Sequence, residues 1–155
     1  MNAPRIVTDD TAMDRALALA AEAAQADEIP VGAVVLDAEG RILAEGRNNR
    51  EETADPTGHA EIVALRAAAV AQGSWNLTGC TLVVTMEPCV MCAGAILQSR
   101  VARVVFGAWD DKAGAAGSLY DVLRDRRLPY RAEVVGGVRE DEAVEQLRAF
   151  FAERR

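Results

Sequence analysis

The amino-acid sequence predicts an α/β sandwich in which helices cover a mostly buried, mixed sheet of about five strands. The first observation behind this prediction is the order of the segments: a helix, a hairpin, and then alternating strands and helices. The second is the composition, because 50% of the residues are hydrophobic and 26% are charged, as is usual for a globular protein. The third is the length of 155 residues, which fits one domain and can bury a core without disulfides. We therefore expect a single domain over residues 1–155.

A helix and a β-hairpin are expected first. Residues 11–28 are rich in alanine and place Met13 and Leu17 at helical spacing, which predicts an amphipathic helix. The β-rich runs 29–37 and 41–48 flank a short Ala-Glu-Gly segment, and this pattern predicts a hairpin.

A helix, a strand and a further helix are expected next. The helix predicted over residues 56–73 opens with turn residues and stops at Gly73. Residues 80–86 contain the β-branched residues typical of a buried strand. The helix predicted over residues 89–99 is entered through Pro88, since proline is tolerated in a first helical turn.

Two strands and a helix are expected last. Residues 103–108 predict a buried strand, and residues 130–138 predict the final one. Residues 141–155 place Val144 and Phe151 on one apolar stripe, which predicts a C-terminal helix. No apolar run approaches the roughly 18 residues of a membrane span, so we expect no membrane partner.

The charge and the cysteine content narrow the class of function. The net charge is −7, from 24 acidic and 17 basic residues, which argues against a globally basic surface for nucleic acid. Local basic clusters are candidate contacts, although solvated faces explain each of them equally well. Three cysteines, two of them in CxxC spacing, favour metal or redox use in a reducing compartment, so we expect a cytoplasmic protein. The N-terminal ten residues contain no apolar signal core. The basic clusters are Arg124, Arg126 and Arg127 in one segment, and Arg154 and Arg155 at the end of the chain.

Cys89 and Cys92 follow Pro88 directly and fit a redox pair, half of a structural zinc site, or two ligands of a catalytic metal. A structural zinc site needs four protein ligands, and only Cys80 remains, which we expect to be a buried small hydrophobe. The chain's one histidine, His59, also lies in the first turn of a predicted helix. Three ligands from two helix N-termini suit zinc with an open fourth position, the arrangement of a catalytic site.

Glu61 follows His59 by two positions in the same predicted helix. At this spacing it points away from the direction of His59, so we do not expect it to be a fourth ligand. A carboxylate beside the metal can instead take a proton from water and return it to a leaving group. A lone glutamate at a helix start is explained by the helix dipole. Together with His59, Cys89 and Cys92, we interpret Glu61 as the catalytic residue.

The residues His59-Ala60-Glu61 and Pro88-Cys89-Val90-Met91-Cys92 match the H-x-E…P-C-x-x-C signature described for zinc-dependent nucleobase deaminases. Within that superfamily the chain resembles the bacterial tRNA adenosine deaminases along nearly its whole length. The segments that carry this resemblance are PVGAVV, DPTGHAEIVALR, TLVVTMEPCVMCAGAILQSRVARVVFGA and DKAGAAGSL. The longer segments are far more specific than the superfamily signature.

The resemblance implies a three-layer α/β/α cytidine deaminase-like sandwich that forms a homodimer. It implies one Zn²⁺ per chain, held by His59, Cys89 and Cys92, and a substrate that is a tRNA anticodon stem-loop. The reaction it implies is hydrolytic conversion of adenosine to inosine at the wobble position. It also implies that Asn48 contacts the flipped base and that Asp110 lies near the substrate ribose.

The chain departs from the family pattern at a few positions near the expected RNA contacts. Trp109 stands where the family usually has a basic residue, and Pro129-Tyr130 replaces a common Asn-His pair. Phe150 and Phe151 match an aromatic pair on the C-terminal helix. Trp109 and Phe151 are therefore candidate RNA contacts, and Trp109 could stack on a base. Packing of Trp109 against the sheet edge, or of the Phe pair in the core, explains these residues equally well.

Two other functions are consistent with parts of the sequence. A deaminase of a free base or nucleoside, such as guanine, cytosine or cytidine, is favoured by the acidic charge and opposed by the GAAGSL match. A non-enzymatic zinc or thiol redox module is consistent with the CxxC pair. Such a module does not need His59 or Glu61.

Overall fold

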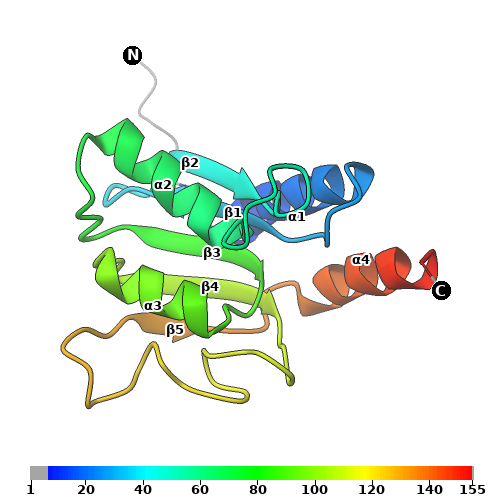
Figure 1. Ribbon diagram of the computed structural model, residues 1–155. Helices are drawn as coiled ribbons and strands as arrows, with labels where there is room; N and C mark the ends of the chain where they lie inside the picture. Colours follow the sequence, from blue (N-terminus) through cyan, green and yellow to red (C-terminus); the bar gives the residue numbers. More distant parts are fainter. Residues whose placement is uncertain (1–6, 155) are drawn as a thin grey trace.

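The computed structural model describes residues 7–154, which form four helices and one five-stranded sheet (Figure 1). Residues 1–6 and Arg155 lie outside this part of the chain. The structure therefore describes neither most of the N-terminal segment without a signal core nor the second arginine of the C-terminal cluster. The elements are α1 (Asp9–Gln25), β1 (Gly32–Leu36), β2 (Ile42–Arg47), α2 (Ala60–Gln72), β3 (Thr81–Met86), α3 (Val90–Gln98), β4 (Arg103–Ala108), β5 (Glu133–Val135) and α4 (Glu140–Ala152).

The sheet is mixed, with the strand order β2-β1-β3-β4-β5. β1 pairs antiparallel with both β2 and β3, so that Val34 lies opposite Val83. β3, β4 and β5 are parallel, with Leu82 opposite Val104. The predicted mixed sheet of about five strands is therefore confirmed.

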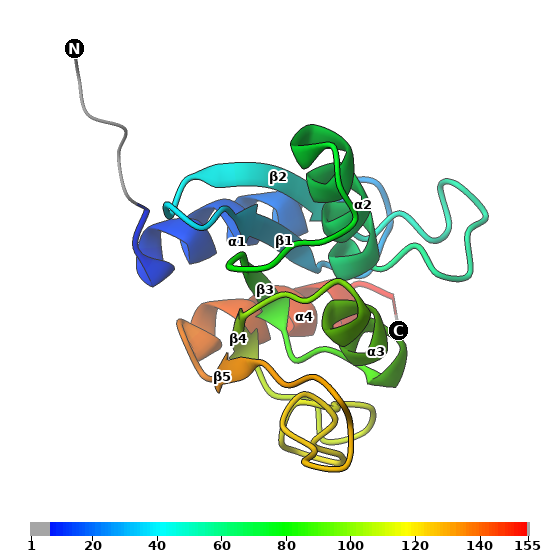
Figure 2. The same cartoon turned by 90° about the vertical axis from the view of Figure 1, so that its left-hand side faces the viewer.

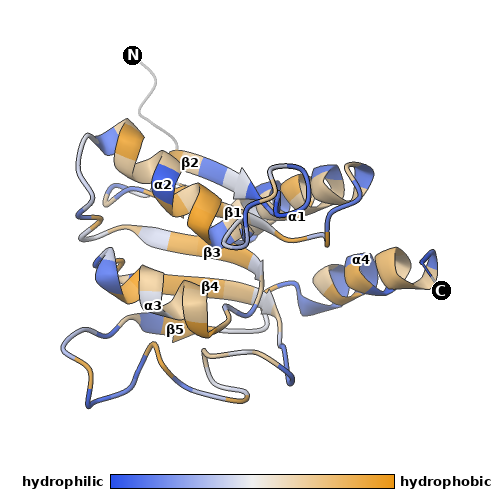
Figure 3. Cartoon of the chain, viewed as in Figure 1, coloured by the Kyte–Doolittle hydropathy of each residue, from blue (hydrophilic) through white to orange (hydrophobic). Residues whose placement is uncertain are grey.

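Helices cover both faces of the sheet. α2 and α3 pack on one face, and α1 and α4 pack on the other (Figures 1 and 2). β1 is buried along its whole length because it lies between both helix layers. The colouring in Figure 3 agrees with a sheet buried between two helix layers. The central strands are largely hydrophobic, whereas α4 alternates between hydrophilic and hydrophobic residues. The three-layer α/β/α sandwich is confirmed.

The arrangement of the strands brings two helix N-termini to one edge of the sheet. β2 and β3 run in the same direction, because each is antiparallel to β1. α2 follows β2 and α3 follows β3, so both helices begin beyond the carboxyl ends of parallel-running strands. Ligand sites in α/β proteins gather at such edges.

The helix boundaries differ from the predicted ones for identifiable local reasons. α1 begins at Asp9, because the side chain of Thr8 accepts a hydrogen bond from the Thr11 amide and caps the helix. α2 begins at Ala60 rather than at residue 56, and it ends as predicted before Gly73, which has a left-handed backbone with φ of 75°. His59 and Cys89 are N-cap residues rather than first-turn residues, so Pro88 precedes α3 instead of starting it.

The last strand is shorter than predicted. β5 has three residues, whereas the sequence predicts a strand over residues 130–138. It ends before Gly136, where an added Cβ would lie 2.6 Å from the ring of Phe106 and 2.7 Å from that of Trp109. Among residues 7–154, none of the helices combines the length and the apolar content that crossing a bilayer requires.

Candidate functional site

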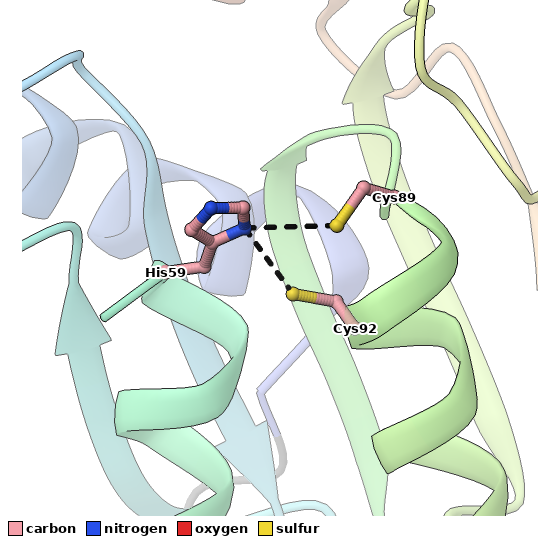
Figure 4. A group of neighbouring side chains, drawn as sticks. All are labelled: His59, Cys89 and Cys92. Atoms are coloured by element: carbon pink, nitrogen blue, oxygen red, sulfur yellow. Dashed lines mark hydrogen bonds between the residues drawn. The ribbon is translucent and has the colours of Figure 1, made fainter. Parts of the chain in front are cut away.

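The three predicted metal ligands meet between the starts of α2 and α3 (Figure 4). The Nδ1 atom of His59 lies 3.6 Å from Sγ of Cys89 and 3.5 Å from Sγ of Cys92. In a tetrahedral site with a Zn–N bond of about 2.0–2.1 Å and a Zn–S bond of about 2.3 Å, the N···S separation is about 3.5 Å. The donor set and its spacing therefore fit one Zn²⁺ with a fourth position open.

The helix starts explain why these side chains are free to bind a metal. His59 and Cys89 are both N-cap residues with extended backbones, and neither side chain makes a capping hydrogen bond. Cys92 follows in the first turn of α3 and is fully buried. The unpaired amide groups of a helix start favour negative charge nearby, which suits two thiolates.

The ionisation of the cysteines and of His59 reflects their mutual contact. The hydrogen bond from Cys92, together with that from His59, lowers the pKa of Cys89 to about 4 despite partial burial. The hydrogen bond to Cys89 and burial raise the pKa of Cys92. The hydrogen bond with Cys89 raises the pKa of His59 as well. Because zinc binds the thiolate and the neutral imidazole, metal binding here would release the protons that these side chains carry.

Glu61 lies in the first turn of α2 beside this group. Its side chain is 4% exposed and lines the same pocket as His59 and Cys89. Burial is the largest cause that raises its pKa, to about 7, and the negative charge of Cys89 adds to the effect. A carboxyl group of this kind can both accept and release a proton near neutral pH.

His59 and Cys89 line a cavity of about 620 Å³. This volume lies in the range of roughly 300–1,000 Å³ typical of small-molecule sites. Its wall carries more acidic than basic side chains, which repeats the acidic balance of the whole chain. The charged lining residues are Asp27, Glu28, Glu51, Glu61, Glu87 and Asp110 with Arg50 and Arg154.

Asn48, the predicted base contact, lines this cavity in a fixed orientation. Its Nδ2 donates to the carbonyl of Ile29 at 3.2 Å, and its Oδ1 accepts from the amide of Arg50 at 3.2 Å. Because a carbonyl faces the NH₂ group and an amide faces the oxygen, the side chain cannot flip without losing both bonds. One N–H of Asn48 remains to donate to a ligand.

Asp110, the predicted ribose contact, also lines the cavity. Its Oδ1 accepts from the amides of Lys112 and Ala113, at 3.1 and 3.2 Å. Its own amide donates to Oε1 of Glu87 at 2.9 Å. The buried Glu87 has a lowered pKa, because hydrogen bonds from Asp110, Ser118 and neighbouring amides outweigh the desolvation that would raise it.

The structure separates the two candidate RNA contacts. Phe151 lines the cavity and is half exposed, with its ring packed edge to face on Phe150. Trp109 is not one of the described residues that line the cavity. Its ring packs edge to face on that of Phe106, with the ring centroids 4.8 Å apart. Trp109 therefore packs against the sheet, with 43% of its surface exposed, and base stacking by it stays a prediction.

Sequence reasoning missed several residues that form the pocket wall. Glu28 and Glu87 are almost completely buried, although carboxylates rarely are. Glu28 accepts a hydrogen bond from the amide of Glu52 at 2.7 Å and so holds the loop that carries Arg50. For Glu87 a signal existed, since a charged residue directly follows the apolar strand that ends at Met86.

Comparison with known families gives one matching family model. Residues 6–108 match the model described as the cytidine and deoxycytidylate deaminase zinc-binding region. This match covers more than half of the chain and includes all three ligand positions.

Two curated relatives differ in length. A tRNA(Ile)-lysidine synthase of Deinococcus deserti is 53% identical over 94% of this chain, which spans only 27% of that protein. A tRNA-specific adenosine deaminase of Bacillus subtilis is 45% identical over 95% of this chain and 91% of its own length.

Solved structures agree in fold. A structure from a study of A-to-I editing by tRNA:A34 deaminases at the wobble position of transfer RNA has a TM-score of 0.84. It is 40% identical and covers 88% of this chain and 98% of its own. A guanine deaminase from Nitrosomonas europaea has a TM-score of 0.80 at 30% identity, and covers 97% of this chain and 89% of its own.

Proposed function

Because the chain belongs to the cytidine and deoxycytidylate deaminase family, we propose that it hydrolyses adenosine to inosine at the wobble position of a tRNA anticodon. The observation that carries this proposal is the placement of Glu61 beside His59, Cys89 and Cys92, where Glu61, His59 and Cys89 line a cavity of about 620 Å³. The high identity to a tRNA-specific adenosine deaminase over most of both chains supports the choice of substrate.

The residues divide into holders of a metal and residues that act on the substrate. His59, Cys89 and Cys92 would hold one Zn²⁺ per chain, and the bound ion would supply an activated water by lowering its pKa. Glu61 takes a proton from the attacking water and delivers protons to the ring nitrogen and to the departing ammonia. The free N–H of Asn48 donates to the base, and Asp110 accepts from the ribose.

The target base must leave its stack to reach the cavity. An anticodon loop permits this cheaply, because its bases are already unpaired. Phe151 at the cavity wall offers a ring for a neighbouring base. We propose that the chain acts as one deaminase domain in the cytoplasm, where its tRNA substrate is found.

A substitution at Glu61 tests the proposed chemistry. Glu61→Gln keeps the shape of the side chain but cannot take up a proton, so ammonia release from a wobble-adenosine stem-loop should fall by about 10²- to 10⁴-fold. The zinc content, measured on the same sample, should remain near one per chain. Glu45→Gln, which changes a carboxylate outside the cavity, is the matched control. Full activity in Glu61→Gln would refute the role of Glu61.

A second candidate function is the deamination of a free base or nucleoside. The net charge of −7 and the acidic cavity wall favour a small substrate over a polyanion, and a guanine deaminase shares the fold. Parallel assays on the stem-loop and on free adenosine, guanine and cytosine separate the two. Product from the free bases alone would overturn the tRNA proposal.

We also propose that the chain forms a homodimer through the outer face of α3. This helix has no charged residue from Val90 to Gln98, yet Val90 is 52% exposed and Met91 is also exposed. The loop that carries the exposed Leu119 and Tyr120 lies next to it, since Cys89 forms a bridge with Gly114 and the Tyr120 amide donates to the Gly114 carbonyl. Exposed apolar side chains on two neighbouring segments fit contact with a second copy of the chain.

A further inference from the structure

The carboxylate of Glu87 is the centre of a hydrogen-bond network that spans two distant parts of the chain. It stands directly after β3 and is 3% exposed. Its partners come from the loop 110–118, which lies 23 to 31 residues further along the chain. The same loop supplies Asp110 and Ala113 to the cavity wall.

Each oxygen of this carboxylate accepts two hydrogen bonds. Oε1 accepts from the amide of Asp110 at 2.9 Å and from the hydroxyl of Ser118 at 2.6 Å. Oε2 accepts from the amides of Ala116 at 3.0 Å and Ser118 at 3.1 Å. No neutral side chain of this size can replace it, because an amide has only one acceptor oxygen and would turn its NH₂ group toward two donors.

The loop is shaped to admit this carboxylate. A Cβ added at Gly114 would lie only 2.3 Å from Cδ of Glu87, so the carboxylate occupies the space that any larger residue would need. Further bonds close the loop on itself and on the metal-ligand segment. The Gly114 amide donates to the carbonyl of Asp110 at 2.8 Å, and the Ala115 amide donates to the carbonyl of Pro88 at 2.7 Å.

The hydrogen-bond network around Glu87 fixes the position of Asp110. Its amide is held by Glu87, and its carbonyl accepts from the amide of Gly114. The Ser118 hydroxyl, whose one proton goes to Glu87, lies 2.7 Å from the same carbonyl. Its Oδ1 is occupied by two amides of its own loop, whereas Oδ2 makes no hydrogen bond among the described residues. Oδ2 is therefore the acceptor available to a ligand, and Glu87 fixes where it lies.

We propose that Glu87 is a positioning residue for substrate binding, which acts by holding the loop 110–118 so that Asp110 presents its carboxylate to the substrate sugar. This inference rests on the proposed function for its substrate. Glu87 also lines the cavity, but both of its oxygens are taken up by the loop, so its effect passes through Asp110. Loss of the network should weaken binding of the nucleotide more than it slows proton transfer at Glu61.

An activity-independent experiment measures the order of the loop. Lys112 is the only lysine in the sequence and lies inside the loop, so lysyl endopeptidase cuts the native chain only there. Glu87→Gln should be cut at Lys112 at least tenfold faster than the wild type, and Glu45→Gln should be cut at the wild-type rate. Equal cutting rates for Glu87→Gln and the wild type would refute the proposed anchoring.

A double-mutant cycle then tests whether Glu87 acts through Asp110. Glu87→Gln should raise KM for the stem-loop about tenfold or more and change kcat little, with zinc content retained. Asp110→Ala should have the same effect alone and add little to Glu87→Gln, because the two changes remove one contact. Effects that multiply in the double variant would overturn the proposal.

Ser118→Ala is a second variant for both the protease and the kinetic experiment, and it tests the proposal if Glu87→Gln does not fold. It removes the hydroxyl that contacts both Glu87 and the Asp110 carbonyl but leaves the carboxylate and its three amide donors. A smaller rise in both KM and the cutting rate supports the proposal, and wild-type values of both contradict it. If the wild type itself does not convert the stem-loop, the proposed function fails while the protease result still stands.

Discussion

At the scale of single residues, the ion pair between Asp9 and Arg103 joins the start of α1 to the start of β4. The guanidinium donates to both carboxylate oxygens, at 2.8 and 2.6 Å, and its Nε lies 3.6 Å from Glu133. The hydrogen bond from Arg103 is the main cause that holds the pKa of Asp9 below its ordinary value of 3.8, against partial burial. Two elements that are 94 residues apart are thereby linked in a pH-dependent way.

The stability contributed by this pair should disappear in acid. Since the folded-state pKa of Asp9 lies below that of the unfolded chain, its contribution is complete above about pH 4 and is lost as the pH falls through the lowered value. Asp9→Asn should reduce the free energy of unfolding by about 0.5–1 kcal/mol at pH 7, because both side chains are about one-third exposed. Urea unfolding of both proteins from pH 7 to pH 3 measures the difference. A difference that does not shrink below pH 4 would contradict the ion-pair explanation.

The sequence identifies residues whose role depends on their own chemistry. His59, Cys89 and Cys92 are recognisable because few residue types bind zinc, and their spacing places them at helix starts. Glu28 and Glu87 could not be recognised in this way, since the donors that surround them lie 23 or more residues away in loops without regular structure. Only the folded chain shows which amides those carboxylates meet.

At the scale of elements, α4 decides how far the cavity is covered. Its start is fixed to α1 by the ion pair of Arg139 with Asp14, and Gln146 donates to the carbonyl of Leu17 at 2.9 Å. Its end is held by Arg154, which pairs with Asp27 and lies 3.5 Å above the ring of Phe150. The helix thus carries aromatic rings to the wall of the cavity.

Phe151 should contribute to the binding of RNA but not to the chemistry. If its exposed ring stacks on a base, Phe151→Ala should raise KM for the stem-loop by about 5- to 150-fold, which corresponds to about 1–3 kcal/mol, with kcat nearly unchanged. Leu128→Ala removes another exposed apolar side chain that does not line the cavity, and it should leave KM unaltered. An unchanged KM in Phe151→Ala would show that this ring only packs on α4.

Helices and strands were predictable from the sequence where the hydrophobic periodicity and the turn or capping residues agree. The hairpin and the end of α2 at Gly73 follow from turn chemistry, and buried strands such as β3 follow from their β-branched residues. The start of α2 and the length of β5 did not follow from these signals. β5 ends next to Gly136, which packs closely against the rings of Phe106 and Trp109. The antiparallel pairing of β1 with β3 is a long-range choice that no local pattern encodes.

At the scale of the whole molecule, the proposed dimer rests on the uncharged face of α3. Met91→Glu places a charge in the proposed apolar interface, which should convert the dimer to a monomer in sedimentation experiments, while the far-UV circular dichroism stays the same. Ile42→Glu, an equally exposed apolar position on the edge strand β2, serves as the control and should leave the dimer intact. A wild-type protein that sediments as a monomer would contradict the proposed interface.

The separation between the helix starts that hold the metal ligands and the loops that form the cavity wall has an evolutionary consequence. His59, Cys89 and Cys92 are placed by the sheet and its two helix starts, whereas Arg50, Asp110 and the α4 side chains belong to segments at the rim. Mutation in those segments can therefore change what the cavity binds without disturbing the grouping of His59, Cys89 and Cys92. A lineage with this architecture can diversify its ligands while it keeps this group of side chains.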